Sequence, residues 1–223
     1  MSEINYDYIN SFIRDMIPKD LSIVGKIEDE ARKNNMPIIQ KEVARLISVL
    51  LSIKKPKKIL EIGTAVGYSS ILMSKYLQPG GKIITIERYD IMQKAAKENI
   101  KRAGLENIIN IIENDAEEVL PNLEESFDVI FIDAAKGQYN TFLPHCIRLL
   151  NEEGLIIADN VLHKGMIAKS RYDIPRRQRT IHKRMRNFLW EIMNNPSLES
   201  CVLPMGDGVA LCHKINRKEE IND

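Results

Sequence analysis

The chain has 223 residues, of which 44% are hydrophobic and 28% are charged, and its formal net charge is +1. This length and composition predict one α/β domain and exclude a disordered or fibrous protein. The longest apolar runs are far too short to span a bilayer, and the N-terminus lacks the basic start and apolar stretch of a signal peptide. We therefore expect a cytoplasmic protein without a membrane partner, whose scattered cysteines, Cys146, Cys201 and Cys212, stay reduced.

The predicted secondary structure changes near residue 56. Before it, apolar side chains recur at helical spacing, as at Val43, Leu46, Ile47 and Leu50, which predicts a helical segment over 1–55. After it, short β-branched runs without apolar–polar alternation are typical of strands buried on both faces. We expect strands at 57–62, 82–87, 108–113, 127–133 and 154–159, with helices near 69–77, 89–103, 116–121, 138–150 and 176–194.

Two further apolar runs, 200–205 and 208–214, flank Gly206-Asp207, which is a hairpin signal. The alternating strands and helices predict a single domain over 1–223 whose α/β core covers 56–215. Its sheet is expected to have seven strands, mostly parallel, with a C-terminal antiparallel hairpin, helices on both faces and extra N-terminal helices. Ligands bind such sheets beyond the carboxyl ends of the strands. Five acids close or directly follow predicted strands: Glu61, Glu87, Asp115, Asp133 and Asp159.

The loop after the first predicted strand reads E-I-G-T-A-V-G-Y-S (61–69). It lacks the G-x-G-x-x-G of dinucleotide enzymes, which disfavours an oxidoreductase. Its E-x-G-x-x-x-G pattern resembles the first motif of the Rossmann-like class I methyltransferases, which use S-adenosylmethionine. A plain strand–turn–helix, a surface Glu87 and a helix cap at Asp115 are the structural alternatives. The resemblance implies cofactor contacts at Met36, Glu61, Gly63, Gly67, Tyr68, Ser69, Glu87, Asp115, Ala116 and Asp133.

The next two predicted strands lead into F-I-D-A-A-K (131–136) and A-D-N-V (158–161). Asp133, Asp159 and Asn160 would meet at neighbouring strand ends and offer an all-oxygen set suited to Mg²⁺, or to Mn²⁺ or Ca²⁺. Such an ion would leave room for two substrate oxygens and a water. The D-x-x-K and A-D-N-V segments resemble the metal-dependent O-methyltransferases of the catechol and caffeoyl-coenzyme A type, over residues 36–214.

That resemblance implies metal ligands at Asp133, Asp159 and Asn160 and catalytic roles for Lys136 and Asp133. Lys136 could accept the substrate proton if burial depresses its pKa. An ordinary surface lysine, a salt bridge to one of the acids, and water as the proton acceptor remain open. Relatives suggest a homodimer.

A strongly basic segment, 164–186, contains nine Lys or Arg against one acid. It follows Asn160 closely, so we expect it to border the active site and to contact phosphates. A solvated helix face is the alternative. Ala134 and Ala135 leave more space than the bulky residues of catechol enzymes. RNA contacts are expected at Lys164, Arg176, Arg177, Arg179, Lys183 and Arg186, four of which (176, 179, 183 and 186) would form one stripe on a helix.

Together with P-M-G-D-G-V-A (204–210), these segments resemble most the branch that methylates 5-hydroxyuridine at the wobble position of bacterial tRNA. The base carries its 5-hydroxyl beside a carbonyl oxygen, and the anticodon loop can present it unpaired. The main alternative is an O-methyltransferase for a small catechol-like or coenzyme A-linked phenol. A non-enzymatic RNA-binding module is disfavoured, because binding alone needs no metal ligands.

Overall fold

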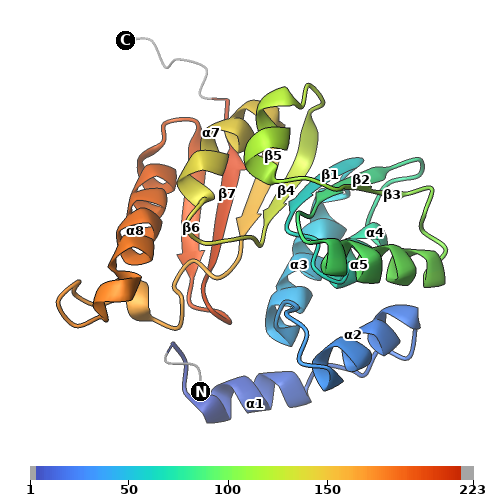
Figure 1. The fold of residues 1–223 in the computed structure, drawn as a ribbon, viewed down its shortest axis with the longest axis horizontal. Coiled ribbons are helices and arrows are strands. Elements are labelled where there is room, and N and C mark those ends of the chain that lie inside the picture. Colours follow the sequence, from blue (N-terminus) through green and yellow to red (C-terminus); the bar gives the residue numbers. More distant parts are fainter. Residues whose placement is uncertain (1–3, 217–223) are drawn as a thin grey trace.

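Seven strands form one mixed sheet, with the order β3-β2-β1-β4-β5-β7-β6 (Figure 1). The computed structural model describes residues 4–216. Strands β1 to β5 are parallel, and β7 runs antiparallel to both β5 and β6. The predicted seven-stranded α/β sheet with its C-terminal hairpin is therefore confirmed. The strands are β1 (Lys58–Ile62), β2 (Lys82–Ile86), β3 (Ile109–Ile112), β4 (Phe127–Ile132), β5 (Leu150–Ala158), β6 (Leu198–Leu203) and β7 (Val209–Lys214).

The helices cover both faces of this sheet and build two separate apolar cores. One core packs α7 and α8 against side chains such as Leu60 and Ile130, and the other packs α2, α3 and α4 against their strand neighbours Ile59 and Val129. Successive residues of a strand point to opposite faces, so a strand with both faces covered must be apolar throughout. The helices are α1 (Asp7–Asp15), α2 (Ile23–Lys33), α3 (Lys41–Lys54), α4 (Tyr68–Ser74), α5 (Asp90–Arg102), α6 (Ala116–Val119), α7 (Tyr139–Leu149) and α8 (Arg179–Asn194).

Most element boundaries shift by one or two residues from the predictions, and three differences need a structural reason. Helix α4 ends at Ser74 rather than 77, because the following residues continue as tighter turns with N–H groups bonded three residues back. Strand β5 begins at Leu150 rather than 154, where its pairing with Phe127 is followed by a register shift. The predicted helix over 176–194 opens with a separate 3₁₀ helix, Arg176–Gln178, so Arg176 does not lie on α8 itself.

The N-terminal helices lie along one side of the sheet and reach its C-terminal hairpin (Figure 1). The side-chain amide of Asn5 donates to the carbonyl of Pro204 (2.6 Å). Arg14 on α1 donates through Nε and Nη2 to the buried carboxylate of Glu42 on α3. These contacts hold α1 against the rest of the chain. Among the described residues, no helix is both long and apolar enough to cross a membrane.

Candidate active site

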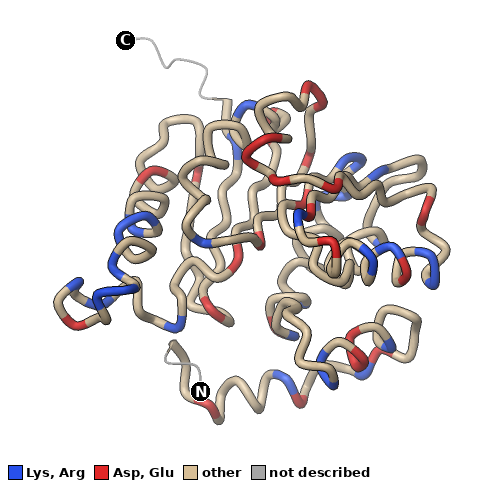
Figure 2. The backbone as a smooth tube through the Cα atoms, viewed as in Figure 1, with Lys and Arg blue, Asp and Glu red and all other residues tan. Residues whose placement is uncertain are grey.

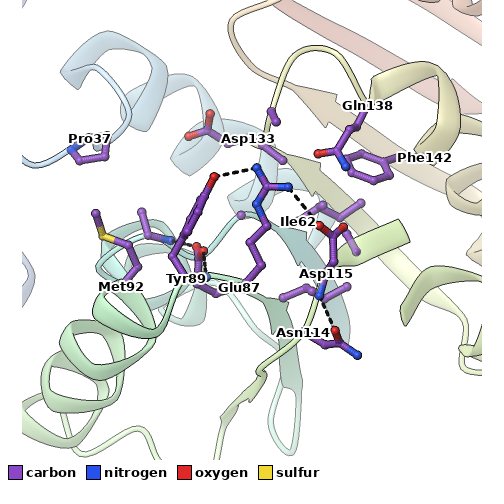
Figure 3. Close-up of a pocket in the computed structure, with 17 residues that line it drawn as sticks. Pro37, Ile62, Glu87, Tyr89, Met92, Asn114, Asp115, Asp133, Gln138 and Phe142 are labelled. Atoms are coloured by element: carbon purple, nitrogen blue, oxygen red, sulfur yellow. Dashed lines mark hydrogen bonds and ion pairs between the residues drawn. The ribbon is translucent and has the colours of Figure 1, made fainter. Parts of the chain in front are cut away.

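A cavity of about 380 Å³ lies at the carboxyl ends of β1, β2, β3 and β4 (Figure 3). It is walled by the loops that follow these strands, by Pro37 and by the first turns of α7. This is the edge at which parallel sheets bind ligands. Its size suits a small cofactor, since ligand pockets typically measure about 300–1,000 Å³. The predicted residues that line it are Gly63, Glu87, Asp115, Ala116 and Asp133.

Two glycines shape the loop that follows β1. Gly63, which lines the cavity, has φ +101°, and Gly67, the N-cap of α4, has φ +81°; residues with side chains rarely adopt such angles. A Cβ on Gly63 would stand 2.1 Å from the carbonyl oxygen of Asp133. Glycine at position 63 therefore lets the loop after β1 approach the end of β4. This close contact brings the loop and Asp133 together in the wall of one cavity.

Glu87 is fixed at the cavity wall by two backbone groups. It is only 7% exposed, and its carboxylate accepts hydrogen bonds from the N–H of Ala65 and the N–H of Tyr89, both at 2.9 Å. The bond to Ala65 joins the end of β2 to the glycine-containing loop. Carboxylate oxygens have further lone pairs, so Glu87 can still accept the paired hydroxyls of a ribose, as its predicted role requires.

Asp115 is both a helix cap and a partner of Arg88. It accepts from the N–H of Glu117 at the start of α6 (2.9 Å) and from Nη1 of Arg88 (3.0 Å). These bonds lower the pKa of the Asp115 carboxyl, the backbone bond most. Arg88 also donates to the Tyr89 hydroxyl (2.7 Å) and lies over the Tyr89 ring, and both residues line the cavity.

The remaining predicted cofactor residues lie behind the cavity rather than on its wall. Glu61 is fully buried and accepts from the hydroxyls of Ser70 and Thr85. Burial raises its pKa to about 7. The structure thus places Glu61 as a support beneath the loop, with one carboxylate oxygen, Oε1, lacking a partner among the described residues. Met36 packs into the core beside Pro37, while Gly67, Tyr68 and Ser69 are buried at the start of α4.

The three predicted metal ligands meet at the tips of β4 and β5. The Asn160 side-chain amide donates to Oδ1 of Asp133 (3.0 Å), and its backbone N–H donates to Oδ1 of Asp159 (2.7 Å). Asn160 has φ 62°, a left-handed conformation that asparagine tolerates better than most residues. Tyr139 supports this corner by donating to the carbonyl of Asp159 (2.9 Å).

The two carboxyl groups of this set are held in an environment that opposes their charge. Asp159 is 3% exposed. Burial raises the pKa of both carboxyls, and the neighbouring Asp133 carboxylate raises that of Asp159 further. Within residues 4–216 no three His, Cys, Asp or Glu side chains gather as a metal site, so the available set is two carboxylates and one amide. A hard divalent cation fits these oxygens and would offset their repulsion.

Lys136 lies next to this set and contacts His163, a residue that the sequence did not single out. The Lys136 Nζ lies 2.9 Å from Nδ1 of His163. A charged ammonium can only donate hydrogen bonds, so Nδ1 must be the acceptor of this bond. Burial lowers the pKa of Lys136, while Asp207, Asp133 and Asp159 oppose that shift. Burial and the Lys136 charge lower the pKa of His163, which favours a neutral imidazole able to accept the bond.

The basic residues form an exposed band over α8 and the segment before it (Figure 2). Lys164, Arg176, Arg177, Lys183 and Arg186 are exposed, whereas Arg179 is half-buried. A small cavity of about 230 Å³ separates the loop after β5 from this band, and both His163 and Lys164 line it. Since His163 contacts Lys136, the basic segment begins beside the candidate catalytic lysine.

Several cavity residues were missed by sequence reasoning: Arg88, Tyr89, Met92, Asn114, Gln138 and Phe142. Each lies within a few residues of a predicted strand end or helix start. Their proximity to those ends was the available signal, but which side chains turn inward depends on the packing of the loops.

Comparisons with known proteins identify the family. The O-methyltransferase family profile matches residues 19–215. A catechol O-methyltransferase of Niastella koreensis is 33% identical over 169 residues, covering 73% of this chain and 76% of that protein. This chain belongs to the O-methyltransferase family. It is an S-adenosylmethionine-dependent O-methyltransferase of the catechol and caffeoyl-coenzyme A type, and five of the ten residues expected to bind the cofactor line the 380 Å³ cavity.

Solved structures agree with this assignment. A Staphylococcus aureus protein provisionally described as a caffeoyl-CoA O-methyltransferase superimposes with a TM-score of 0.85 at 32% identity, covering 93% of this methyltransferase and 100% of that chain. An O-methyltransferase from Bacillus cereus in complex with SAH gives 0.80 at 26% identity, with 93% and 97% coverage.

We predict that Gly63→Ala destabilises the methyltransferase more than Gly104→Ala. Both glycines have positive φ, but a Cβ at Gly104 meets nothing within 4 Å. The control should lose about 1–2 kcal/mol of unfolding free energy from left-handed strain. Gly63→Ala should lose about 1–3 kcal/mol more, because its Cβ overlaps the Asp133 carbonyl. Urea unfolding measures both values, and equal losses would contradict the close contact.

We predict that Glu87→Gln weakens cofactor binding roughly tenfold to hundredfold, since hydrogen bonds to a charged group contribute about 1.5–3 kcal/mol. Calorimetric titration with S-adenosylmethionine measures the dissociation constant. Glu113→Gln is the matched control, because Glu113 is exposed and pairs only with Lys97 (2.6 Å) among the described residues. An unchanged constant for Glu87→Gln would remove this residue from the cofactor site.

Proposed function

We propose that this methyltransferase uses a divalent metal ion, in the first place Mg²⁺, to methylate the 5-hydroxyl of 5-hydroxyuridine at the tRNA wobble position. The observation that carries the metal requirement is the pairing of the buried carboxylate of Asp159 with the half-buried carboxylate of Asp133, joined through Asn160. Leaving two such charges together in a poorly solvated place is unfavourable without a cation. A divalent ion held there would lower the pKa of a coordinated substrate hydroxyl toward neutrality.

The residues of the chain then position and deprotonate the substrate. Lys136 is the candidate acceptor of the hydroxyl proton at Nζ, because burial favours its neutral form. His163 restrains that side chain through the contact between its Nδ1 and the lysine Nζ. Ile62, Ala134 and Phe142 contribute apolar surface to the cofactor cavity and exclude water from it. Holding the attacking oxygen in line with the transferred methyl group supplies most of the rate gain.

The tRNA substrate is supported by the space and charge around this centre. Ala134 and Ala135 leave room beside Asp133 for a base rather than a tightly enclosed phenol ring. The basic band begins at Lys164, next to His163, and can follow a phosphate backbone. 5-Hydroxyuracil offers two vicinal oxygens, which matches a metal set with three protein ligands.

The second candidate substrate is a small catechol-like or coenzyme A-linked phenol. It is favoured by the named relatives, which include a catechol O-methyltransferase and a caffeoyl-coenzyme A O-methyltransferase of Petroselinum crispum that is 28% identical over 96% of this chain. In that case the basic band would meet the phosphates of coenzyme A.

We also propose that the enzyme is a homodimer. Exposed apolar side chains on α1 and α3, namely Tyr8, Phe12, Val49 and Ile53, offer a surface that a second copy could cover.

We predict that the purified enzyme transfers a labelled methyl group from S-adenosylmethionine to an anticodon stem-loop containing 5-hydroxyuridine, and does so with a far higher kcat/KM than to catechol or caffeoyl-coenzyme A. The triple variant Arg176→Ala, Arg177→Ala, Arg179→Ala should raise KM for the stem-loop and flatten its salt dependence, since each lost phosphate contact lowers the salt slope by about one. Preference for the phenols would transfer the assignment to the second candidate.

We predict that Mg²⁺ raises the melting temperature, and more strongly at about pH 9 than at about pH 6. Burial raises the folded-state pKa of Asp133 and Asp159 above their unfolded values, so the metal-free fold binds extra protons and loses stability as pH rises through this range. At a pH where both carboxyls are ionised, bound Mg²⁺ offsets this loss of stability. Differential scanning calorimetry with chelator or Mg²⁺ measures the shift, and Asp159→Asn should abolish most of it. An equal Mg²⁺ shift in that variant would exclude this site.

A further inference from the structure

A second cavity, of about 690 Å³, lies between α1, the start of α3 and the loop after β5. It is distinct from the cofactor cavity, with which it shares no lining residue. We call it the α1 groove. Helix α1 forms one wall, the start of α3 another, and the loop after β5 and the turn of the β6–β7 hairpin close it. Its lining residues are Asp7, Asn10, Ser11, Arg14, Arg32, Gln40, Lys41, Lys164 and Asp207.

The α1 groove contains a polar side chain that faces the cavity. Asn10 is 8% exposed and lines the groove, and its amide keeps some contact with solvent and has no hydrogen-bond partner among residues 4–216. Buried amides in folded proteins are nearly always hydrogen-bonded to protein, water or ligand. By contrast, Arg14 is satisfied by Glu42 and Gln40, and Arg32 by Glu28 and a backbone carbonyl. The Asn10 amide is therefore available to a bound molecule.

Two lysines supply positive charge to the same groove, which two aspartates, Asp7 and Asp207, also line. Lys41 is the first residue of α3, and Lys164 lies in the loop after β5. Within the described part of the chain neither ammonium forms an ion pair or hydrogen bond. Lys164 has φ 56°, as part of a run in which His163 and Gly165 are also left-handed. Strained backbone of this kind is concentrated at functional sites, and Lys164 lines the groove at this point.

The α1 groove also adjoins the candidate catalytic lysine. Asp207 and Lys164 line it, and both act electrostatically on Lys136: Asp207 raises the lysine's pKa and Lys164 lowers it. His163, the chain neighbour of Lys164, contacts Lys136 directly. A substrate whose reactive hydroxyl lies at Lys136 can therefore extend into the groove.

We propose that the α1 groove binds a phosphate group of the substrate, with Lys41 and Lys164 as its cationic partners and the Asn10 amide as a hydrogen-bond donor. This inference rests on the proposed function and adds residues of the N-terminal helices to the phosphate contacts that begin at Lys164 in the basic band. For tRNA, the phosphate belongs to a nucleotide flanking the methylated base, so the N-terminal helices and α8 would both hold the strand. For a coenzyme A ester it would be a phosphate of the carrier.

The test compares Lys41→Ala and Asn10→Leu with the wild-type enzyme. Lys101→Ala is the matched control, because Lys101 is exposed on α5 and does not line the groove. Equilibrium binding is measured by fluorescence anisotropy for a hydroxyuridine stem-loop and by calorimetry for caffeoyl-coenzyme A, over a range of salt concentrations. Circular dichroism melts establish that each variant is folded.

We expect Lys41→Ala to raise the dissociation constant of the phosphate-bearing substrate roughly fivefold to tenfold and to lower the salt slope by about one. Asn10→Leu should weaken binding without changing the slope, because it removes a neutral donor. The control should match the wild type. If neither ligand binds the wild type, or if the three variants bind alike, the groove assignment is overturned. Failure of the proposed function would give a different result. The stem-loop would bind tightly without methyl transfer, or the groove variants would weaken binding of the coenzyme A ester alone.

Discussion

The enclosure of two carboxyl groups at adjacent strand tips is the constraint on which the active centre depends. Asp133 and Asp159 are brought together because β4 and β5 are parallel neighbours, so both chains end at the same edge of the sheet. Asn160 joins the pair through its backbone and its side chain. Such a cluster is unfavourable by itself and becomes favourable when a cation binds. The stability of this corner and its chemistry are thus coupled.

The cofactor cavity is built around the same corner. Gly63 allows the loop after β1 to contact the Asp133 carbonyl, and Glu87 anchors that loop to β2 through the N–H of Ala65. The buried carboxylate of Glu61 accepts from Ser70 on α4 and from Thr85 on β2, which ties the helix after that loop to the same strand. Cofactor, metal and substrate would therefore meet over one rigid set of strand ends, which is how a transferable methyl group and an acceptor oxygen can be held in line.

Much of this arrangement could be predicted from sequence because it follows from backbone topology. Buried β-branched runs indicated parallel strands, and acids at their ends indicated a shared edge; the meeting of Asp133 with Asp159 then required no side-chain information. Side-chain direction could not be inferred in this way. Glu61 turns into the core, Arg88 pairs with Asp115, and His163 reaches Lys136, each because of loop packing. These motifs were enough to predict the family. The choice of substrate depends instead on the surface around Lys164, which backbone topology constrains less.

The most direct measurement is a crystal structure of the enzyme with S-adenosylmethionine and Mn²⁺, with data collected at the manganese absorption edge. The account predicts one anomalous peak coordinated by oxygens of Asp133, Asp159 and Asn160, beside the cofactor. Side chains that point apart without a peak between them, in crystals that contain the cofactor, would contradict it.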